Sequence, residues 1–333
     1  MIPIRSIVIG LIAMTIVSSS GAKTLQFSGR TWNIKKGNGL GPGPNNWSDN
    51  NSHVFVDNDD KLHLKVEQIG SSWFSSEVTL QQSLGYGTYE FRLETDVEQF
   101  DRNVVLGLFT YKSDVEEIDI ELTQFGRPND PYGHFVVQPA FHTGNRSLFD
   151  LNLNSDFSTH SFTWLPDRIE FQSLHGHRSI PQSPTDIIHQ FTYTGADIPP
   201  DSTERVHINF WQFQGNPPSN GQSHEVVIES FTFIPAGSFL ADFDNDSDVD
   251  GDDLMQWEDS FGANNLSDAD RDGDSDGGDF LIWQQQFGSG TPPVVDSGSV
   301  PEPSTWGLLI TLVFGWPMLR IGKFRSMQTG DIG

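Results

Sequence analysis

Hydrophobic and polar residues alternate with a period of two through most of the middle of the chain. The alternation is clearest in segments 62–66, 89–93, 104–111, 134–141, 162–171, 206–211 and 226–234. Period two places successive side chains on opposite faces of a strand, and Gly and Pro residues separate these segments as turns do. No run of helical periodicity over three turns interrupts them. We therefore expect residues 23–235 to form an all-β, two-sheet sandwich of about ten or more strands.

The N-terminus has a different pattern, a continuous apolar run. Arg5 precedes the run at residues 7–17, and the small residues 20–22 follow it. This order is typical of a secretory signal peptide over residues 1–22, and the run is short for a permanent membrane helix. An uncleaved N-terminal anchor is the alternative.

A second apolar segment closes the chain. The linker 291–304 ends in a Pro-Glu-Pro motif at 301–303, and the apolar stretch 306–319 is followed by Arg320, Lys323 and Arg325. An apolar segment stopped by cations obeys the positive-inside rule, so we expect an exported protein held at the cell surface by its tail or released outside. The motif, with segment 305–325 and the short tail 326–333, resembles the PEP-CTERM sorting tails of bacteria. That resemblance implies an exosortase-type partner.

Composition excludes several classes of protein. The 333 residues carry 45 Asp and Glu against 19 Lys and Arg, a net charge of −26. A nucleic-acid partner is not expected, because phosphates are bound by clustered cations. The absence of Cys excludes disulfides, thiolate metal sites and thiol nucleophiles.

Acidic residues are concentrated in a 26-residue repeat near the C-terminus. Residues 241–288 hold fifteen Asp and Glu and one Arg, and the aromatic pair Trp257 and Phe261 recurs as Trp283 and Phe287. A plain acidic linker is the alternative, but charge runs do not repeat aromatics in register. Each unit places Asp at positions 1, 3, 5, 9 and 12 of a loop, the oxygen-ligand spacing of an EF-hand-type calcium site. The candidate metal ligands are Asp242, Asp244, Asp246, Asp250 and Asp253 in the first loop and Asp268, Asp270, Asp272, Asp276 and Asp279 in the second.

Duplicated loop-plus-helix units of this kind resemble dockerin modules. The resemblance implies a small α-helical module over residues 236–290, two Ca²⁺ ions, and a cohesin-like protein as partner; an intramolecular spacer is the alternative. Because uncompensated carboxylates repel one another, we expect the module to fold only with metal.

One strand of the predicted sandwich carries alternating acids. Glu117, Asp119 and Glu121 share one face, and the apolar residues between them share the other. Four steps of about 3.3 Å put the outer Cα atoms about 13 Å apart, and side chains leaning inward on a curved sheet bring the carboxyls towards the roughly 5–5.5 Å of a retaining glycosidase. Burying three carboxylates in a dry core is costly, so this face lines a wet groove or a metal site. Catalysis, a calcium site on the sheet and a solvated acidic strand all remain open on spacing alone.

Flanking segments carry a family resemblance. The runs 84–92, 164–171 and 209–211, in order with the acidic strand, resemble glycoside hydrolase family 16 over nearly all of residues 40–235. The resemblance implies a concanavalin-like β-jelly roll and a polysaccharide substrate. It also implies Glu117 as nucleophile, Asp119 as helper and Glu121 as general acid/base, with no cofactor in the hydrolytic chemistry.

Four further residues are candidates for sugar binding. Trp211 is a candidate stacking platform, with core packing as the alternative. Asn46 and Trp47 are expected in a loop at the rim of the site, or else in a turn with a half-buried indole. His142, expected on the strand after the acids, is a candidate hydrogen-bond donor to substrate or a structural histidine.

The sequence thus favours an exported retaining endo-glycosidase for β-glucan-type or galactan-type polysaccharide. A non-catalytic carbohydrate-binding or surface-assembly protein with a lectin-like jelly roll is the alternative. The acids favour the first reading.

Overall fold

The computed structural model describes residues 22–290. The predicted signal peptide lies almost wholly outside the described residues, and the predicted linker, sorting segment and tail lie entirely outside them. Among residues 22–290, none of the helices has the length and apolar character needed to cross a membrane.

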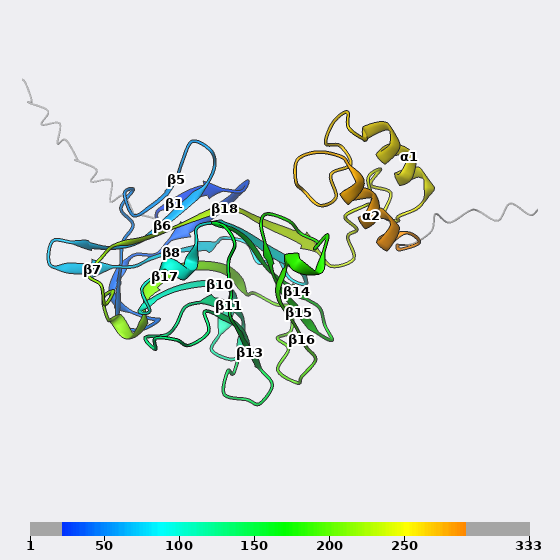
Figure 1. The fold of residues 1–333 in the computed structure, drawn as a ribbon. Helices are drawn as coiled ribbons and strands as arrows, with labels where there is room; N and C mark the ends of the chain where they lie inside the picture. The colour runs from blue at the N-terminus through cyan, green and yellow to red at the C-terminus, as the bar shows by residue number, and fades with distance from the viewer. Residues whose placement is uncertain (1–21, 291–333) are drawn as a thin grey trace, which may run out of the picture. The chain divides into compact units, whose positions relative to one another are not determined.

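The described chain is mostly strand, with two α-helices near its end (Figure 1). The elements are β1 (Thr24–Phe27), β2 (Arg30–Ile34), β3 (Gly37–Leu40), β4 (Asn45–Trp47), β5 (Val54–Val56), β6 (Leu62–Ile69), β7 (Ser72–Phe74), β8 (Ser76–Leu80), β9 (Gly87–Glu94), η1 (Val97–Gln99), β10 (Val104–Ser113), β11 (Glu116–Leu122), β12 (Gly133–Val137), β13 (Arg146–Phe149), β14 (Phe157–Trp164), β15 (Ile169–His175), η2 (Pro184–Asp186), β16 (Ile187–Tyr193), β17 (Arg205–Gln212), η3 (Phe213–Gly215), β18 (His224–Pro235), α1 (Gly251–Ser260) and α2 (Gly277–Gln286).

Two antiparallel sheets form the sandwich. The first, here called the cleft sheet, has the order β1-β2-β8-β17-β10-β11-β12-β13. The second, here called the outer sheet, has the order β16-β15-β14-β9-β18-β6-β5, with β7 paired to β6. Sequence neighbours are often not sheet neighbours: β17 lies between β8 and β10, and β18 lies between β6 and β9. This crossing of the chain between two layers is the jelly-roll arrangement that the alternating pattern predicts in outline.

The core lies between the two sheets. Ile118, Ile120 and Leu122 of β11 are fully buried in it, together with Phe91 and Tyr89 from β9 of the outer sheet. Burial of each such side chain stabilises the fold by about 1.5–3 kcal/mol. The period-two residues of each strand therefore hold the sheets together and aim the intervening residues away from the core.

Two predicted strands end earlier than the alternation suggests. Segment 162–171 is a hairpin rather than one strand, because the turn 165–168 separates β14 from β15. Segment 134–141 stops at Val137, and Gln138 and Pro139 leave the sheet. Proline lacks the backbone N–H that a ladder requires, which explains both endings.

The 26-residue repeat forms two loop-helix units related by reciprocal contacts. Asp250 caps α1 and Asp276 caps α2, each with its side chain. The indole of Trp257 donates to the carbonyl of Asp276 at 2.9 Å, and that of Trp283 donates to the carbonyl of Asp250 at 2.8 Å. Each unit therefore closes on the helix start of the other, which explains why the aromatics recur in register.

Candidate active site

The three acids of β11 open into one cleft of about 410 Å³ on the cleft sheet. Glu117, Asp119 and Glu121 all line it, while the alternate residues of the strand are buried in the core. Asp119 is buried at 3% exposure, and the two glutamates are partly exposed. The acids are thus neither splayed apart nor sealed under other side chains.

Strand register adds a second and a third column of side chains to the cleft. On β10, Gly107 lies opposite Glu121, and Phe109 lies opposite Asp119. On β17, Asn209 lies opposite Gly107, and His207 lies opposite Phe109. Because opposite residues in a ladder share a face, these side chains line the cleft with the acids.

Gly107 makes room for Asn209 beside Glu121. A Cβ at residue 107 would lie 2.5 Å from Oδ1 of Asn209, a distance that side chains do not tolerate. Asn209 is 3% exposed, and its Oδ1 has no hydrogen-bond partner among the described residues. An amide oxygen left unpaired in a cleft is available to a ligand hydroxyl.

A charged network forms the opposite wall. Nζ of Lys35 lies 2.7 Å from Oε2 of Glu77, and Nδ1 of His207 lies 3.1 Å from Oε1 of the same carboxylate. Lys35 also lies over the Trp47 ring, 4.1 Å from its centroid, and the His207 ring stacks on Phe109 at 5.0 Å. Glu77 thus pairs with Lys35 and contacts His207 through its other oxygen.

The environment raises the pKa of all three acids on β11. Burial, with a smaller contribution from repulsion by Glu117, raises the pKa of Glu121 to about 8. Burial raises the pKa of Glu117 to about 7 against a hydrogen bond from Asp119, which lowers it. Burial first, and then repulsion by both glutamates, raises the pKa of Asp119 well above its usual range. At neutral pH the arrangement keeps a proton on Glu121, leaves Glu117 close to its midpoint and shifts Asp119 towards its protonated form.

Gln138 orients the central acid. Its Nε2 donates to Oδ2 of Asp119 at 3.0 Å, and its Oε1 accepts from the backbone N–H of Ala140 at 2.8 Å. The amide is held at both ends, so the Asp119 carboxyl has a defined orientation towards Glu117. Gln138 occupies this place because the chain leaves the sheet directly after β12.

Trp211 lies in the cleft wall and is 7% exposed. It packs on Trp47 and Val105 in a small cluster of its own. Both interpretations from the sequence therefore apply to it: most of the indole is packed, and part of it faces the cleft. Its role as a sugar platform stays a prediction.

The other three predicted binding residues lie elsewhere. Trp47 belongs to strand β4 rather than to a rim loop, and at 1% exposure it has no face free for a sugar. Asn46 does not line the cleft and donates to the carbonyl of Trp73 at 3.2 Å. His142 follows β12 in a turn, with Nδ1 2.8 Å from Oδ2 of Asp197, and faces a separate surface groove. None of these three residues lines the cleft of the acids, and their contact with substrate stays a prediction.

Sequence reasoning missed Lys35, Glu77, His207, Asn209 and Gln138. Gln138, His207 and Asn209 lie in segments whose alternation is visible, whereas Lys35 and Glu77 lie outside them. Alternation alone does not say which strands are neighbours or which face meets the acids. Asn209 is the residue of this group that the sequence indicates most clearly as a cleft residue, because it lies two residues before Trp211 and therefore shares the same face of the strand.

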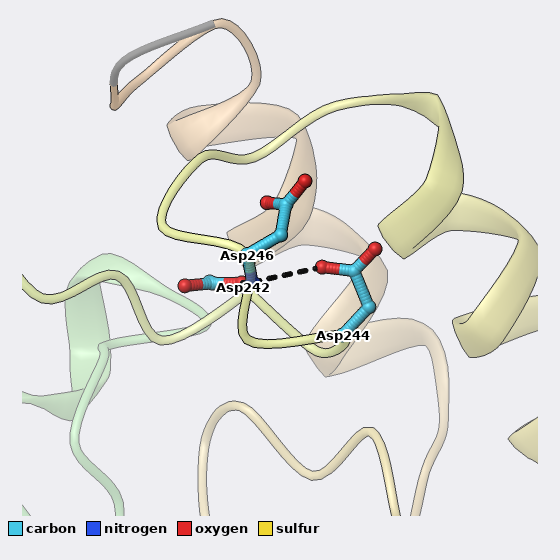
Figure 2. Close-up of side chains that lie close together, drawn as sticks. All are labelled: Asp242, Asp244 and Asp246. Atoms are coloured by element: carbon cyan, nitrogen blue, oxygen red, sulfur yellow. Dashed lines mark hydrogen bonds between the residues drawn. The ribbon is translucent and has the colours of Figure 1, made fainter. Parts of the chain in front are cut away.

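The acidic loops of the repeat are a second cluster of interest. Asp242, Asp244 and Asp246 each offer an oxygen within 4.8 Å of the others, and the same holds for Asp268, Asp270 and Asp279. Figure 2 shows the first group, in which the Asp246 backbone N–H donates to Oδ1 of Asp244 at 3.2 Å. The last Asp of each loop, at position 12, accepts three backbone N–H groups with its two oxygens.

Two of the predicted metal ligands serve as helix caps in this structure. Asp250 and Asp276, at position 9, accept from the N–H groups of Asp252 and Gly278 as helix caps. Position 6 has positive φ in both loops, 79° at Ser247 and 106° at Gly273. The sharp turn expected at this position is therefore present in both loops, although only the second has a glycine for it.

A two-sheet jelly roll whose cleft holds three carboxyl groups on one strand is typical of glycosidases with a β-sandwich fold. The family model described as glycosyl hydrolases family 16 matches residues 44–225, more than half of the chain. The chain therefore belongs to glycoside hydrolase family 16. The match ends before the acidic repeat.

Solved structures with a similar fold include several glucanases. The Bacillus licheniformis beta-glucanase is 17% identical, with 65% of this chain and 98% of that chain covered and a TM-score of 0.48. A beta-1,3-glucanase from Mycobacterium marinum is 16% identical, with 61% and 90% covered and a TM-score of 0.47. A pseudo beta-1,3-glucanase of Mycobacterium tuberculosis is 17% identical, with 62% and 91% covered and a TM-score of 0.46. No curated protein sequence matches the chain.

Proposed function

We propose that the protein is a retaining endo-glycosidase that hydrolyses a neutral β-linked polysaccharide of the β-glucan or galactan type. The observation that carries the proposal is the cleft of β11, where three acids share one face and the pKa of Glu121 lies above that of Glu117. Two carboxyls with separated pKa values are what an acid and a nucleophile require. Membership of family 16 supports the same reaction class.

In the first step, Glu121 acts as the acid. It holds a proton at neutral pH and transfers it to the glycosidic oxygen as that bond breaks, while the ionised Glu117 forms a bond to the anomeric carbon. Asp119 donates a hydrogen bond to Glu117 and so favours its ionised form. Gln138 keeps Asp119 oriented for that hydrogen bond.

In the second step, the roles reverse. Glu121, now ionised, takes a proton from water, and the water oxygen attacks the anomeric carbon as its bond to Glu117 breaks. Two inversions at the same carbon give retention. Asn209, with an unpaired amide oxygen beside Glu121, is placed to accept a hydrogen bond from a sugar hydroxyl.

Charge in the cleft favours a neutral substrate. Five carboxyl groups line it, and Lys35, the one Lys or Arg of the lining, is paired with Glu77. The ionised Glu117 that the reaction needs would repel a sulfate or uronate group. We therefore expect sulfated and uronic-acid polysaccharides to be poor substrates.

A polysaccharide panel tests the proposal. Reducing-sugar release is measured on β-1,3-glucan, β-1,3-1,4-glucan, xyloglucan, galactan, a sulfated galactan and a polyuronate, with the Glu117→Gln protein as the blank. We expect hydrolysis of at least one neutral polymer, with retention visible by proton NMR of the first product. Binding to a polymer without any hydrolysis would instead favour a carbohydrate-binding protein.

We further propose that the acidic repeat binds two Ca²⁺ ions. The donors are all oxygen, as Ca²⁺ prefers, and position 12 of each loop is organised by backbone N–H groups. The buried carboxylate of Asp248 has no partner for either oxygen among the described residues, as expected of a group that faces a cation. When bound, Ca²⁺ would neutralise these loops, and the side chains that bring their oxygens together to hold it are Asp242, Asp244 and Asp246 in the first loop and Asp268, Asp270 and Asp279 in the second.

Export and a protein partner remain proposals from the sequence. The N-terminal apolar run and the Pro-Glu-Pro tail support secretion with surface sorting by an exosortase-type system. The repeat exposes the apolar side chains of Met255, Phe261, Leu266, Leu281 and Phe287, which supports a docking role towards a cohesin-like protein. Cell fractionation with an antibody to the jelly roll tests the first proposal, and a pull-down with purified cohesins in calcium tests the second.

A further inference from the structure

Strand β9 is buried on both faces, although its sequence alternates apolar and charged residues. Tyr89, Phe91 and Leu93 face the core at 0% exposure. Glu90 and Arg92 face away from the core and are still only 2% and 8% exposed. A buried ion pair on the solvent side of a sheet requires a cover, because charges are stable there only when their hydrogen bonds are satisfied.

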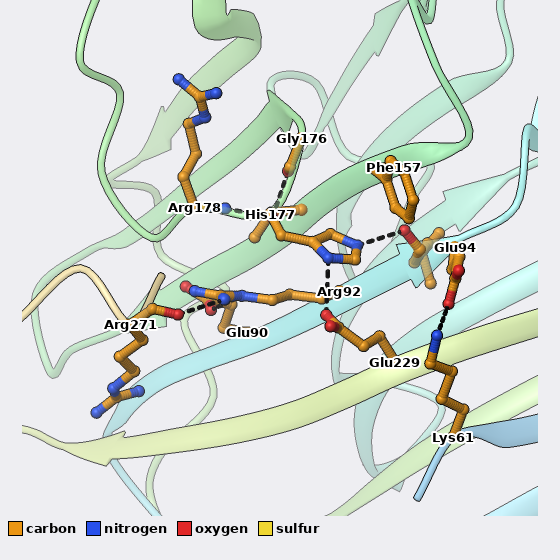
Figure 3. Close-up of polar contacts among 12 residues, drawn as sticks. Lys61, Glu90, Arg92, Glu94, Phe157, Gly176, His177, Arg178, Glu229 and Arg271 are labelled. Atoms are coloured by element: carbon orange, nitrogen blue, oxygen red, sulfur yellow. Dashed lines mark hydrogen bonds and ion pairs between the residues drawn. The ribbon is translucent and has the colours of Figure 1, made fainter. Parts of the chain in front are cut away.

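The second loop of the acidic repeat provides that cover. Arg92 donates from Nη1 to the carbonyl of Arg271 at 2.8 Å and from Nη2 to the carbonyl of Asp270 at 3.2 Å. Its Nε donates to Glu90 at 3.0 Å, and Nη2 also donates to Oγ of Ser179 at 3.2 Å. Figure 3 shows the guanidinium of Arg92 between Glu90 and Arg271. All three nitrogens of the guanidinium are therefore used, and two of them bind the loop.

Side chains beside Arg92 extend the contact. Nε2 of Gln182 donates to Oδ2 of Asp270 at 3.3 Å. Ile180 packs against the small core of the repeat, which contains Ala269 and Ile282. Polar and apolar contacts from the segment between β15 and η2 thus meet the same loop.

The first loop makes no equivalent contact. Among residues 22–290, no side chain outside the repeat donates a hydrogen bond to residues 242–253. The two loops share the hydrogen bonds of position 12. Among the positions at which they differ, position 4 is Asn245 in the first loop and Arg271 in the second. Arg271 is the one cation of the repeat, and it lies near the Glu90 carboxylate.

We propose that Arg92 clamps the second loop onto the outer sheet, so that calcium in this loop stabilises the jelly roll itself. The first loop and α1 are then the part of the repeat open to another protein. The clamp rests on contacts already described, whereas its calcium dependence rests on the proposed metal binding. The two parts are therefore tested separately.

Cysteine pairs test the clamp without metal. The chain has no native Cys, so Ser179→Cys with Arg271→Cys creates a single reactive pair around the Arg92 guanidinium. Ser179→Cys with Asn245→Cys is the matched control at the equivalent position of the first loop. We expect a short bismaleimide to link the first pair at least tenfold faster than the control, by gel mobility and peptide mass spectrometry. Equal rates for the two pairs would overturn the clamp.

Hydrogen exchange tests the coupling to calcium. Calcium that binds only the folded state raises the free energy of unfolding. At a calcium concentration about a hundredfold above the dissociation constant, the midpoint of thermal unfolding should rise by about 5–10 °C. We expect calcium to slow exchange at least tenfold in peptides covering β9 and β18 of the full-length protein. Arg92→Gln should remove this effect on the jelly roll, and Arg127→Gln, an exposed arginine elsewhere, should retain it.

Loop occupancy is measured in the same samples by terbium luminescence sensitised by Trp257 and Trp283. Terbium bound with no change in β9 exchange would overturn the coupling and leave calcium binding intact. No terbium binding would overturn calcium binding, with the cysteine pairs still deciding the clamp. Arg92→Lys, which keeps the charge and loses the paired donors, replaces Arg92→Gln if that variant fails to fold, and we expect it to lose most of the coupling.

Discussion

Two regions of this protein crowd carboxyl groups together, and they relieve the repulsion in opposite ways. In the cleft, burial raises the pKa of Asp119 and raises that of Glu121 to about 8, so Glu121 holds a proton at neutral pH. In the acidic loops, position 12 is satisfied by backbone N–H groups, and the remaining oxygens face one another at the distances of a cation site. Burial raises the pKa of acids in both regions, including that of Asp270 to about 6. The difference is that only the loops bring one oxygen from each of several Asp residues close together, as a cation site requires.

The comparison shows how one residue type serves two chemistries. A proton held by burial can be transferred, so the cleft acids suit acid/base work. A cation held by several oxygens fixes a loop, so the loop acids suit folding and docking. Each of the following predictions changes an acid in one of the two regions.

The largest effect is expected from Glu117→Gln. The amide cannot form the bond to the anomeric carbon, so kcat should fall at least about ten-thousandfold while the protein stays folded. Glu116→Gln is the control, because Glu116 is adjacent in sequence and pairs with Lys112 outside the cleft. Activity on the best polymer of the panel is the measurement, and a residual rate above one per cent would refute the nucleophile.

The pH profile should be bell-shaped. Below about pH 7 Glu117 gains a proton and ceases to be a nucleophile, and above about pH 8 Glu121 loses the proton it must donate. We expect kcat/KM to be maximal between these values and to fall about tenfold per unit on either side. The Glu121→Gln variant lacks the group that titrates on the alkaline side. With a substrate that has a good leaving group and with added azide, which needs no general base, the alkaline loss of rate should disappear.

Removing position 12 of the first loop should unfold its calcium site. Asp253 accepts three backbone N–H groups, and Asp253→Ala leaves them without a partner. We expect at least tenfold weaker calcium binding by calorimetry and a loss of the calcium-induced circular dichroism signal. Asp259→Asn, an exposed change in α1, should do neither.

The smallest effect is a gain in stability from Glu121→Gln. The raised folded pKa of about 8 means that the folded state binds a proton that the unfolded chain releases above its ordinary value of 4.5, so stability falls as pH rises through this range. The Gln side chain of the variant does not ionise, so this loss of folding stability with rising pH should be absent. We expect the melting temperature to rise by a few degrees at pH 8 and by nothing near pH 4, and an equal gain at both pH values would contradict the linkage.

Local pattern predicted much of the fold and the main part of the site. The alternation of β11 separated Ile118 and Ile120 from the acids, because a strand has only two faces and only one of them was apolar. The 26-residue period likewise predicted two equivalent loops with their helices. Tandem symmetry is visible in one dimension, so no tertiary information was needed for it.

Residues brought together from distant strands were not predictable in this way. Glu77, His207 and Asn209 meet the acids only because β17 lies between β8 and β10, an order that the sequence does not state. The places of Trp47 and His142 could not be predicted for the same reason: an aromatic residue near a motif can face the core or a different groove.

The sequence by itself determined which acids share one face of β11 and which Asp residues recur in register in the two loops, because both depend on spacing along a single strand or loop. Only the tertiary structure decided the pKa order of the acids, the network on Glu77 and the burial of Arg92 under the second loop. Desolvation and charge pairing depend on which surfaces come into contact, and packing of the whole chain sets those contacts.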